Sequence, residues 1–208
     1  MKGDTKQMIL DEALSLFAVK GYEGVTVQDI AKAVGIKAPS LYKHYNGKQD
    51  IFDAILDKME ERYKKQALSM NMNGLEAEQD QDLFSGITEE DLFEKVKGLF
   101  LYYLHDDYAV KVRRMMTIEQ YRNKSLSDLY KKQYIEDALL YQKTLFDLFC
   151  NAGVLKNENT QMMAIHFYAP IYLMLILCDN RPYREEESLG ILKQHVQHFG
   201  KLYGNKEK

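Results

Sequence analysis

Residues 21–56 read GYEGVTVQDIAKAVGIKAPSLYKHYNGKQDIFDAIL, and this stretch decides the fold of the 208-residue chain. Apolar residues recur at helical spacing from Val27 to Val34 and predict a short amphipathic helix. Thr26 stands directly before this segment, and Asp29 follows three residues later. This pair forms an approximate capping box, so the sequence predicts a helix that starts at Val27.

A second short helix is predicted after a sharp turn. Gly35 directly follows the first helix and can adopt the positive φ that a tight turn between two helices needs. Pro39 stands in the first turn of the next predicted helix, Ala38–Tyr45, where its missing N–H costs nothing. Leu41 and Tyr45 lie four residues apart and are expected to face inward. Two short helices joined by a glycine turn predict a helix-turn-helix.

Helices are expected on both sides of this motif. The apolar spacing predicts a first helix from Thr5 to Lys20, which Gly21 can end in a left-handed conformation. A longer helix is predicted from Lys48 to about Leu68. The stretch Asn71–Gly86 is acidic and weakly periodic and contains an Asn-Gly pair, so we expect a loop or a poorly ordered connection there.

Four or five further helices are predicted for the rest of the chain. Their approximate ranges are Glu89–His105, Tyr108–Tyr121, Leu126–Asn151, Asn159–Asp179 and Arg184–Tyr203. With only three prolines and 46% hydrophobic residues, the chain is predicted to be an all-α protein with a real core. We expect an N-terminal three-helix helix-turn-helix domain at residues 1–47. A larger C-terminal helical domain is expected at residues 48–208, with a linking helix at 48–68.

The net charge of −3 conceals an uneven distribution along the chain. Residues 1–48 carry 7 Lys and 5 acidic residues, a balance of +2, which leaves 21 Lys and Arg against 26 acidic residues, or −5, for the remainder. No acidic residue occurs between Lys32 and Lys48. A basic face without acids suits the phosphates of DNA, and the major groove is wide enough to admit a helix. The sequence therefore predicts that the second short helix binds duplex DNA.

The quoted stretch resembles the DNA-binding domain of the TetR family of transcriptional regulators, over about the first sixty residues. The resemblance rests on the G-x-x-x-x-T spacing from Gly21 to Thr26, the D-I-A-x-x-V-G-I core, the S-L-Y-x-H-Y recognition helix and Lys48 at the start of the next helix. One departure is Gly47, where similar proteins often place Ser or Thr as the helix cap. Glycine costs only about a few tenths of a kcal/mol at a cap, so the domain is still expected to fold.

The resemblance implies roles for individual residues on DNA. Phosphate contacts are expected from Thr26, Tyr42 and Lys48. The residues expected toward the base edges are Gln28, Lys37, Ala38, Pro39, Ser40, Lys43 and His44. The resemblance also implies a homodimer that binds a palindromic operator in double-stranded DNA, formed through the last two predicted helices, Asn159–Asp179 and Arg184–Tyr203.

Members of the family place a small-molecule pocket inside the helical domain. Fifteen Tyr and ten Met could supply an adaptable apolar cavity with a few polar groups. The candidate lining residues are Tyr102, Tyr103, Met115, Met116, Tyr134, Tyr141, His166 and Phe167. For each of them an ordinary place in the core is the commoner explanation. We expect an unidentified effector to change the angle between the first four helices and the body, with repression as the usual mode.

Other classes of protein find less support in the sequence. His195 and His198 lie three residues apart on a predicted helix, but no cluster of Cys or carboxylates accompanies them, so no metal is expected. No glycine-rich phosphate loop, nucleophile elbow or Ser/His/Asp set is recognisable, so neither an enzyme nor a cofactor is expected. A stronger rival is a DNA-binding regulator that has no small-molecule ligand and answers to a protein partner.

Two further expectations concern location and surface. The N-terminus lacks the pattern of a secretory signal, so a cytoplasmic protein is expected. The apolar segment Met162–Cys178 is interpreted as a buried helix, not as a membrane span. The pair Arg113-Arg114 is expected on a solvated helix face.

Overall fold

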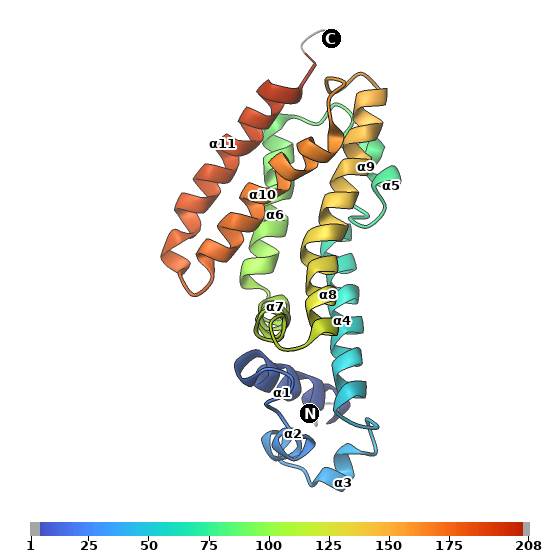
Figure 1. The fold of residues 1–208 in the computed structure, drawn as a ribbon, viewed down its shortest axis with the longest axis vertical. Helices are drawn as coiled ribbons and strands as arrows, with labels where there is room; N and C mark the ends of the chain where they lie inside the picture. Colours follow the sequence, from blue (N-terminus) through green and yellow to red (C-terminus); the bar gives the residue numbers. More distant parts are fainter. Residues whose placement is uncertain (1–4, 206–208) are drawn as a thin grey trace. The chain divides into compact units, whose positions relative to one another are not determined.

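The computed structural model describes residues 5–205, which fold as α-helices without a β-strand (Figure 1). The predicted all-α fold class is confirmed. The described chain divides into two compact units. The first contains the described residues up to Tyr63 together with Asp106–Lys131, and the second contains Lys64–His105 together with the described residues from Lys132 onward. The functional division at residue 47 stays a prediction.

The first unit is built around the helix-turn-helix. Its helices are α1 (Thr5–Lys20), α2 (Val27–Val34), α3 (Ala38–Leu41), the first part of α4 (Lys48–Ser69), α7 (Asp107–Glu119) and α8 (Lys124–Lys131). Helix α1 packs against α2 and α7, so it lies at the centre of this unit. Its inward residues Ile9, Ala13 and Phe17 are fully buried, as the helical spacing predicts.

The predicted capping box and glycine turn are both present. Thr26 Oγ1 accepts a hydrogen bond from the Asp29 N–H at 3.1 Å, and the Asp29 carboxylate accepts one from the Thr26 N–H at 2.9 Å. Gly35 ends α2 with φ 78°. These two local features position the chain to enter α3.

Helix α3 is shorter than the predicted Ala38–Tyr45, because regular α-helix ends at Leu41. Beyond it, the Lys43 N–H donates to the Ser40 carbonyl and the His44 N–H donates to the Leu41 carbonyl, each three residues back. Bonds of this span wind the chain more tightly than an α-helix does. Residues Ala38–Tyr45, called the recognition segment below, are therefore one short α-helical piece followed by tight turns.

The described part of the second unit contains the later part of α4, five α-helices of its own, the π-helical turn η1 (Lys132–Glu136) and the 3-10 helix η2 (Pro182–Arg184). The five are α5 (Ala77–Phe84), α6 (Glu89–His105), α9 (Asp137–Asn151), α10 (Thr160–Cys178) and α11 (Glu185–Tyr203). Helix α10 packs against α9, α11 and α6. In their shared core the Phe199 ring lies 5.2 Å from Phe146 and 4.9 Å from Phe167, between ring centroids.

Helix α5 corrects the prediction of a loop at Asn71–Gly86. Its Asp80 is only 2% exposed, and the Asp80 carboxylate accepts hydrogen bonds from the Gly74 N–H at 2.8 Å and the Tyr141 hydroxyl at 2.6 Å. The apolar pattern of this helix is weak because a carboxylate occupies part of its buried side. Tyr141 lies 61 residues away in the sequence, and a backbone N–H such as that of Gly74 is marked by no residue type, so the local sequence did not indicate burial.

Two other predictions also require correction. The segment Leu126–Asn151 is not one regular α-helix, since η1 interrupts it between α8 and α9. Arg113 is 3% exposed and does not lie on a solvated face, because α7 packs against both α1 and α8. Its neighbour Arg114 is exposed, as predicted.

The turn at Gly35 yields a stability prediction. Replacing Gly35 by Ala puts a Cβ on a residue with φ 78°, which costs about 1 kcal/mol even though no atom stands within 4 Å of that position. We expect the free energy of unfolding, measured by chemical denaturation, to fall by about this amount. Gly47→Ala is the matched control, because Gly47 also has open space around it and no positive φ. Equal losses in the two variants would contradict this explanation.

Candidate DNA-binding site

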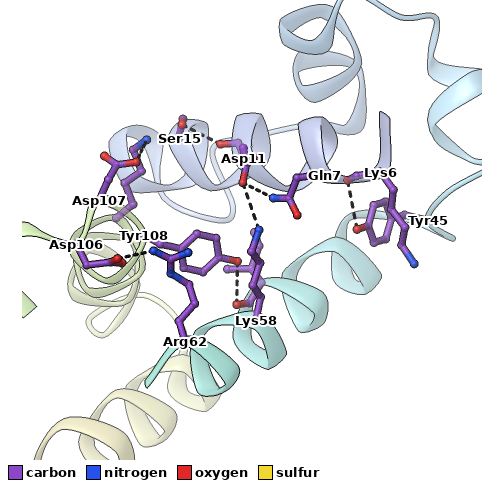
Figure 2. Close-up of polar contacts among 12 residues, drawn as sticks. Lys6, Gln7, Asp11, Ser15, Tyr45, Lys58, Arg62, Asp106, Asp107 and Tyr108 are labelled. Carbon is purple, nitrogen blue, oxygen red and sulfur yellow. Dashed lines mark hydrogen bonds and ion pairs between the residues drawn. The ribbon is translucent and has the colours of Figure 1, made fainter. Parts of the chain in front are cut away.

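The recognition segment is fastened to the first unit by two apolar anchors. Leu41 is fully buried and Tyr45 is 3% exposed, which confirms that these two residues face inward. The Tyr45 hydroxyl donates a hydrogen bond to the Lys6 carbonyl at 3.5 Å, as Figure 2 shows. Because both anchors lie on one side, the intervening residues are turned toward solvent.

The residues predicted to face the base edges all lie on accessible parts of this unit. Gln28, Lys37, Pro39, Lys43 and His44 are exposed, and Ala38 and Ser40 are half-buried. Tyr42, predicted on a phosphate, is 52% exposed. This surface offers cationic, hydroxyl and amide groups to a partner, which are the groups that hydrogen-bond to phosphates and base edges.

The other two predicted phosphate contacts are engaged within the protein. The Thr26 hydroxyl donates to the Asp29 carboxylate at 2.6 Å as part of the capping box. The Lys48 ammonium donates to the Tyr22 carbonyl at 2.9 Å and stands 4.1 Å from the centroid of the Tyr22 ring. Sequence reasoning did not single out Tyr22, because a contact between residues 22 and 48 leaves no local signal.

Helix α7 is joined to α4 by an ion pair at its first turn (Figure 2). The Arg62 guanidinium binds the Asp106 carboxylate, which also caps α7 by accepting a hydrogen bond from the Ala109 N–H at 2.9 Å. Burial alone would raise the pKa of Asp106, but the hydrogen bonds from Arg62 and Ala109 lower it on balance. The carboxylate is thus held in its charged form at the start of α7.

The same junction has two more polar contacts. The Tyr108 hydroxyl of α7 donates to the Ile55 carbonyl of α4 at 3.1 Å, and burial raises the pKa of this hydroxyl. The Lys58 ammonium of α4 stands 3.8 Å from the Asp11 carboxylate of α1 (Figure 2). Helices α1, α4 and α7 are therefore linked by side chains in the unit that carries the recognition segment.

The residues predicted to line an effector pocket are only partly brought together. In the second unit Tyr103 lies 5.2 Å from Tyr102 and 6.1 Å from Tyr134, between ring centroids. The Tyr168 hydroxyl, which sequence reasoning did not select, donates to the Tyr134 carbonyl at 2.5 Å. Tyr134 itself belongs to η1, so this tyrosine cluster lies at an irregular piece of helix.

The remaining predicted pocket residues lie in other surroundings. Tyr141 binds the Asp80 carboxylate, Phe167 belongs to the phenylalanine core, and His166 is exposed. Met115 and Met116 are fully buried in the first unit.

Two open hollows of about 480 and 450 Å³ occur in the second unit. One lies between the end of α9 and the start of α10 and includes Asp147 and Thr160, and the other includes Met70 and Ile87. Neither contains any of the eight predicted lining residues.

An anchored, basic recognition segment on an all-helical scaffold defines a helix-turn-helix DNA-binding protein. Residues 9–55 match the family described as "Bacterial regulatory proteins, tetR family". Over 203 residues the chain is 24% identical to the probable HTH-type transcriptional regulator YttP of Bacillus subtilis, covering 98% of this chain and 90% of YttP. The chain therefore contains the helix-turn-helix DNA-binding domain of the TetR family of transcriptional regulators, at residues 9–55.

Two other similarities concern a short stretch of the sequence and the overall fold. Over 47 residues the chain is 51% identical to IcaR of Staphylococcus epidermidis, named as a negative regulator of the biofilm operon icaADBC, but this covers 23% of the chain and 25% of IcaR. The fold matches SmeT, the repressor of a Stenotrophomonas maltophilia multidrug efflux pump, in its triclosan complex. That match has TM-score 0.66 and 18% identity and covers 98% of this chain and 93% of SmeT.

Proposed function

We propose that this DNA-binding regulator is a cytoplasmic repressor that binds a palindromic operator as a homodimer and is released by a small molecule. The observation that carries the proposal is the exposed row of donors on the recognition segment, fixed by two buried anchors. Within the described part of the chain, the side chains of Lys43 and His44 make no hydrogen bond or ion pair. They are therefore available to a nucleic acid without loss of an internal contact.

The DNA proposal is tested by fluorescence anisotropy on DNA from upstream of the gene of this protein, at two salt concentrations. We expect saturable binding that weakens with salt, because phosphate contacts release counterions. The double variant Lys43→Ala, His44→Ala should bind at least about tenfold more weakly, since a base contact contributes about 1–3 kcal/mol. Its unfolding should be unchanged, because both side chains are exposed.

Lys65→Ala serves as the control, because Lys65 is equally exposed on α4 but lies outside the helix-turn-helix. Unchanged binding by the double variant would remove these two residues from the proposed interface. Equal affinity of the wild-type protein for operator and unrelated DNA would overturn the assignment of this upstream region as the operator.

An exposed apolar stripe on α10 supports the proposed dimer. Met162, Ile165, Leu173 and Ile176 are all between 37% and 52% exposed, and their spacings of three, eight and three residues place them on one side of the helix. Helix α10 is long and apolar enough to cross a membrane, but only 33% of its apolar window is buried within the chain. A second copy would cover the remaining face without a membrane.

Helix α11 offers a similar surface. Ile191 and Leu202 are 38% and 56% exposed and lie eleven residues apart, close to three helical turns, so they share a side. Between them lies the exposed His198. An isologous contact needs the same patch on both copies, and two packed helices that each have an exposed apolar side provide one.

Charge placed in the α10 stripe should separate the dimer. We expect Leu173→Glu to shift the protein to a monomer in light scattering after gel filtration, because burying an unpaired carboxylate in an apolar interface is costly. The same variant should lose affinity for a palindromic operator, since two half-sites would no longer be bound together.

Leu140→Glu is the matched control, because Leu140 is 63% exposed on α9 and lies outside the stripe. A Leu173→Glu protein that stays dimeric, or a wild-type protein that is monomeric at micromolar concentration, would contradict the proposed interface.

The proposed effector site is the tyrosine cluster of the second unit. The half-buried Tyr102 and Tyr103 offer aromatic rings for stacking beside the buried Tyr134, and π-helical turns such as η1 are frequent at functional sites. SmeT, which shares the fold, was solved with an apolar aromatic compound, triclosan. A ligand of this class is therefore the first to test.

The effector proposal is tested by adding triclosan and related apolar aromatic compounds to the protein–DNA complex. A compound that releases the DNA must bind the free protein more tightly than the protein–DNA complex. The ratio of these two affinities equals the factor by which the compound weakens DNA binding. Tyr103→Ala should lower the affinity for that compound. Tyr121→Ala should leave the affinity unchanged, because Tyr121 is 88% exposed in the first unit. If no compound distinguishes the free protein from the complex, control by a protein partner becomes the better explanation.

A further inference from the structure

The Lys48 side chain has an unusual position for a group expected to reach a phosphate. Its ammonium lies over the face of the Tyr22 ring, 4.1 Å from the centroid, and donates to the Tyr22 carbonyl at 2.9 Å. The Glu23 carboxylate stands 3.9 Å away. One residue, Tyr22, thus contacts the ammonium with both its ring and its backbone.

Tyr22 is itself held in place on several sides. Its ring centroid lies 5.4 Å from Phe17 and 5.0 Å from Phe52, and its hydroxyl donates to the Gln49 side chain at 2.9 Å. The Gln49 amide donates in turn to Asp53 at 2.8 Å. The ring is therefore fixed by helix α1 on one side and by helix α4 on the other.

The protonation of Tyr22 is consistent with this arrangement. Burial and the nearby carboxylates of Glu23 and Asp53 raise its pKa, so the hydroxyl stays a donor to Gln49 and the ring stays neutral. A neutral aromatic face attracts a cation, and the attraction grows as the pair is shielded from water.

The Lys48 ammonium still has capacity for a further partner. An ammonium carries three donors, and one of them is used by the Tyr22 carbonyl. The Lys48 side chain is 22% exposed, so solvent reaches it. A flexible lysine at an open surface would lose considerable conformational entropy on binding a phosphate, and a prearranged one loses less.

We propose that Tyr22 is a positioning residue for DNA binding, which holds the Lys48 ammonium at the surface in the geometry that a backbone phosphate accepts. The inference rests on the proposed function in one respect, namely that Lys48 contacts a phosphate of the operator. Tyr22 acts through Lys48 and needs no contact of its own with the DNA.

The salt dependence of operator binding tests the proposal, because it counts phosphate contacts and not overall stability. For each protein, the logarithm of the binding constant is plotted against the logarithm of salt concentration. Loss of one phosphate contact reduces the slope by about 0.9, so a homodimer that loses one contact in each subunit loses about 1.8. We expect Lys48→Ala to show this reduction, and Tyr22→Met, which keeps apolar bulk but removes the aromatic face, to show most of it.

A double variant separates positioning from a structural role. In the Lys48→Ala background, Tyr22→Met should produce no further change in slope, because there is no ammonium left to position. Tyr22→Phe keeps the ring and loses only the hydrogen bond to Gln49, so it should keep most of the wild-type slope. A slope for Tyr22→Met equal to that of the wild-type protein would overturn the proposal, even if the variant were less stable.

If Tyr22→Met does not fold, as judged by circular dichroism, Gln49→Ala alone and Gln49→Ala combined with Lys48→Ala still decide the question. Gln49→Ala frees the Tyr22 hydroxyl without altering the half-buried ring and should reduce the slope partly, but only when Lys48 is present. An equal effect of Gln49→Ala with and without Lys48 would overturn the proposal. A wild-type protein that does not bind the operator would instead refute the proposed function, so the two failures are distinguishable.

Discussion

The DNA-reading surface depends on burial of Leu41 and Tyr45, because the helix that carries it cannot exist alone. Helix α3 has four residues, and isolated helices shorter than about twelve residues are marginal in water. Its conformation is therefore imposed by its two anchors and by the turn before it. The chain gains a rigid reading surface from a segment that has almost no stability of its own.

The parts that the sequence predicted are those with local causes. Thr26 and Asp29, three residues apart, form the capping box, and Gly35 supplies a positive φ. The sequence alone predicts both of these features. The boundaries of α1 and α6 agree with the predicted ranges for the same reason, since a regular apolar stripe is a strong signal. For the candidate DNA-binding site, the location and exposure of the surface followed from the sequence. The roles of its residues on DNA remain predictions.

The parts that the sequence did not predict depend on contacts between distant residues. Asp80 is buried because Tyr141 and two backbone N–H groups satisfy its carboxylate, and no pattern near Asp80 announces them. Arg113 is buried because α7 is covered by other helices, which its own charged neighbours do not reveal. The candidate pocket was chosen by residue type alone, and side chains of one type were found in several surroundings.

The π-helical turn η1 has a consequence for which side chains are buried after it. In a π-helix each hydrogen bond spans one residue more than in an α-helix. The turn Lys132–Glu136 therefore contains one residue more than the same turn of a regular α-helix. The added residue turns all later side chains by about 100° around the helix axis, so α9 buries a different row of side chains than a continuous helix would. The Tyr134 carbonyl within η1 accepts the hydrogen bond of the Tyr168 hydroxyl, so this link to α10 depends on the local change of register.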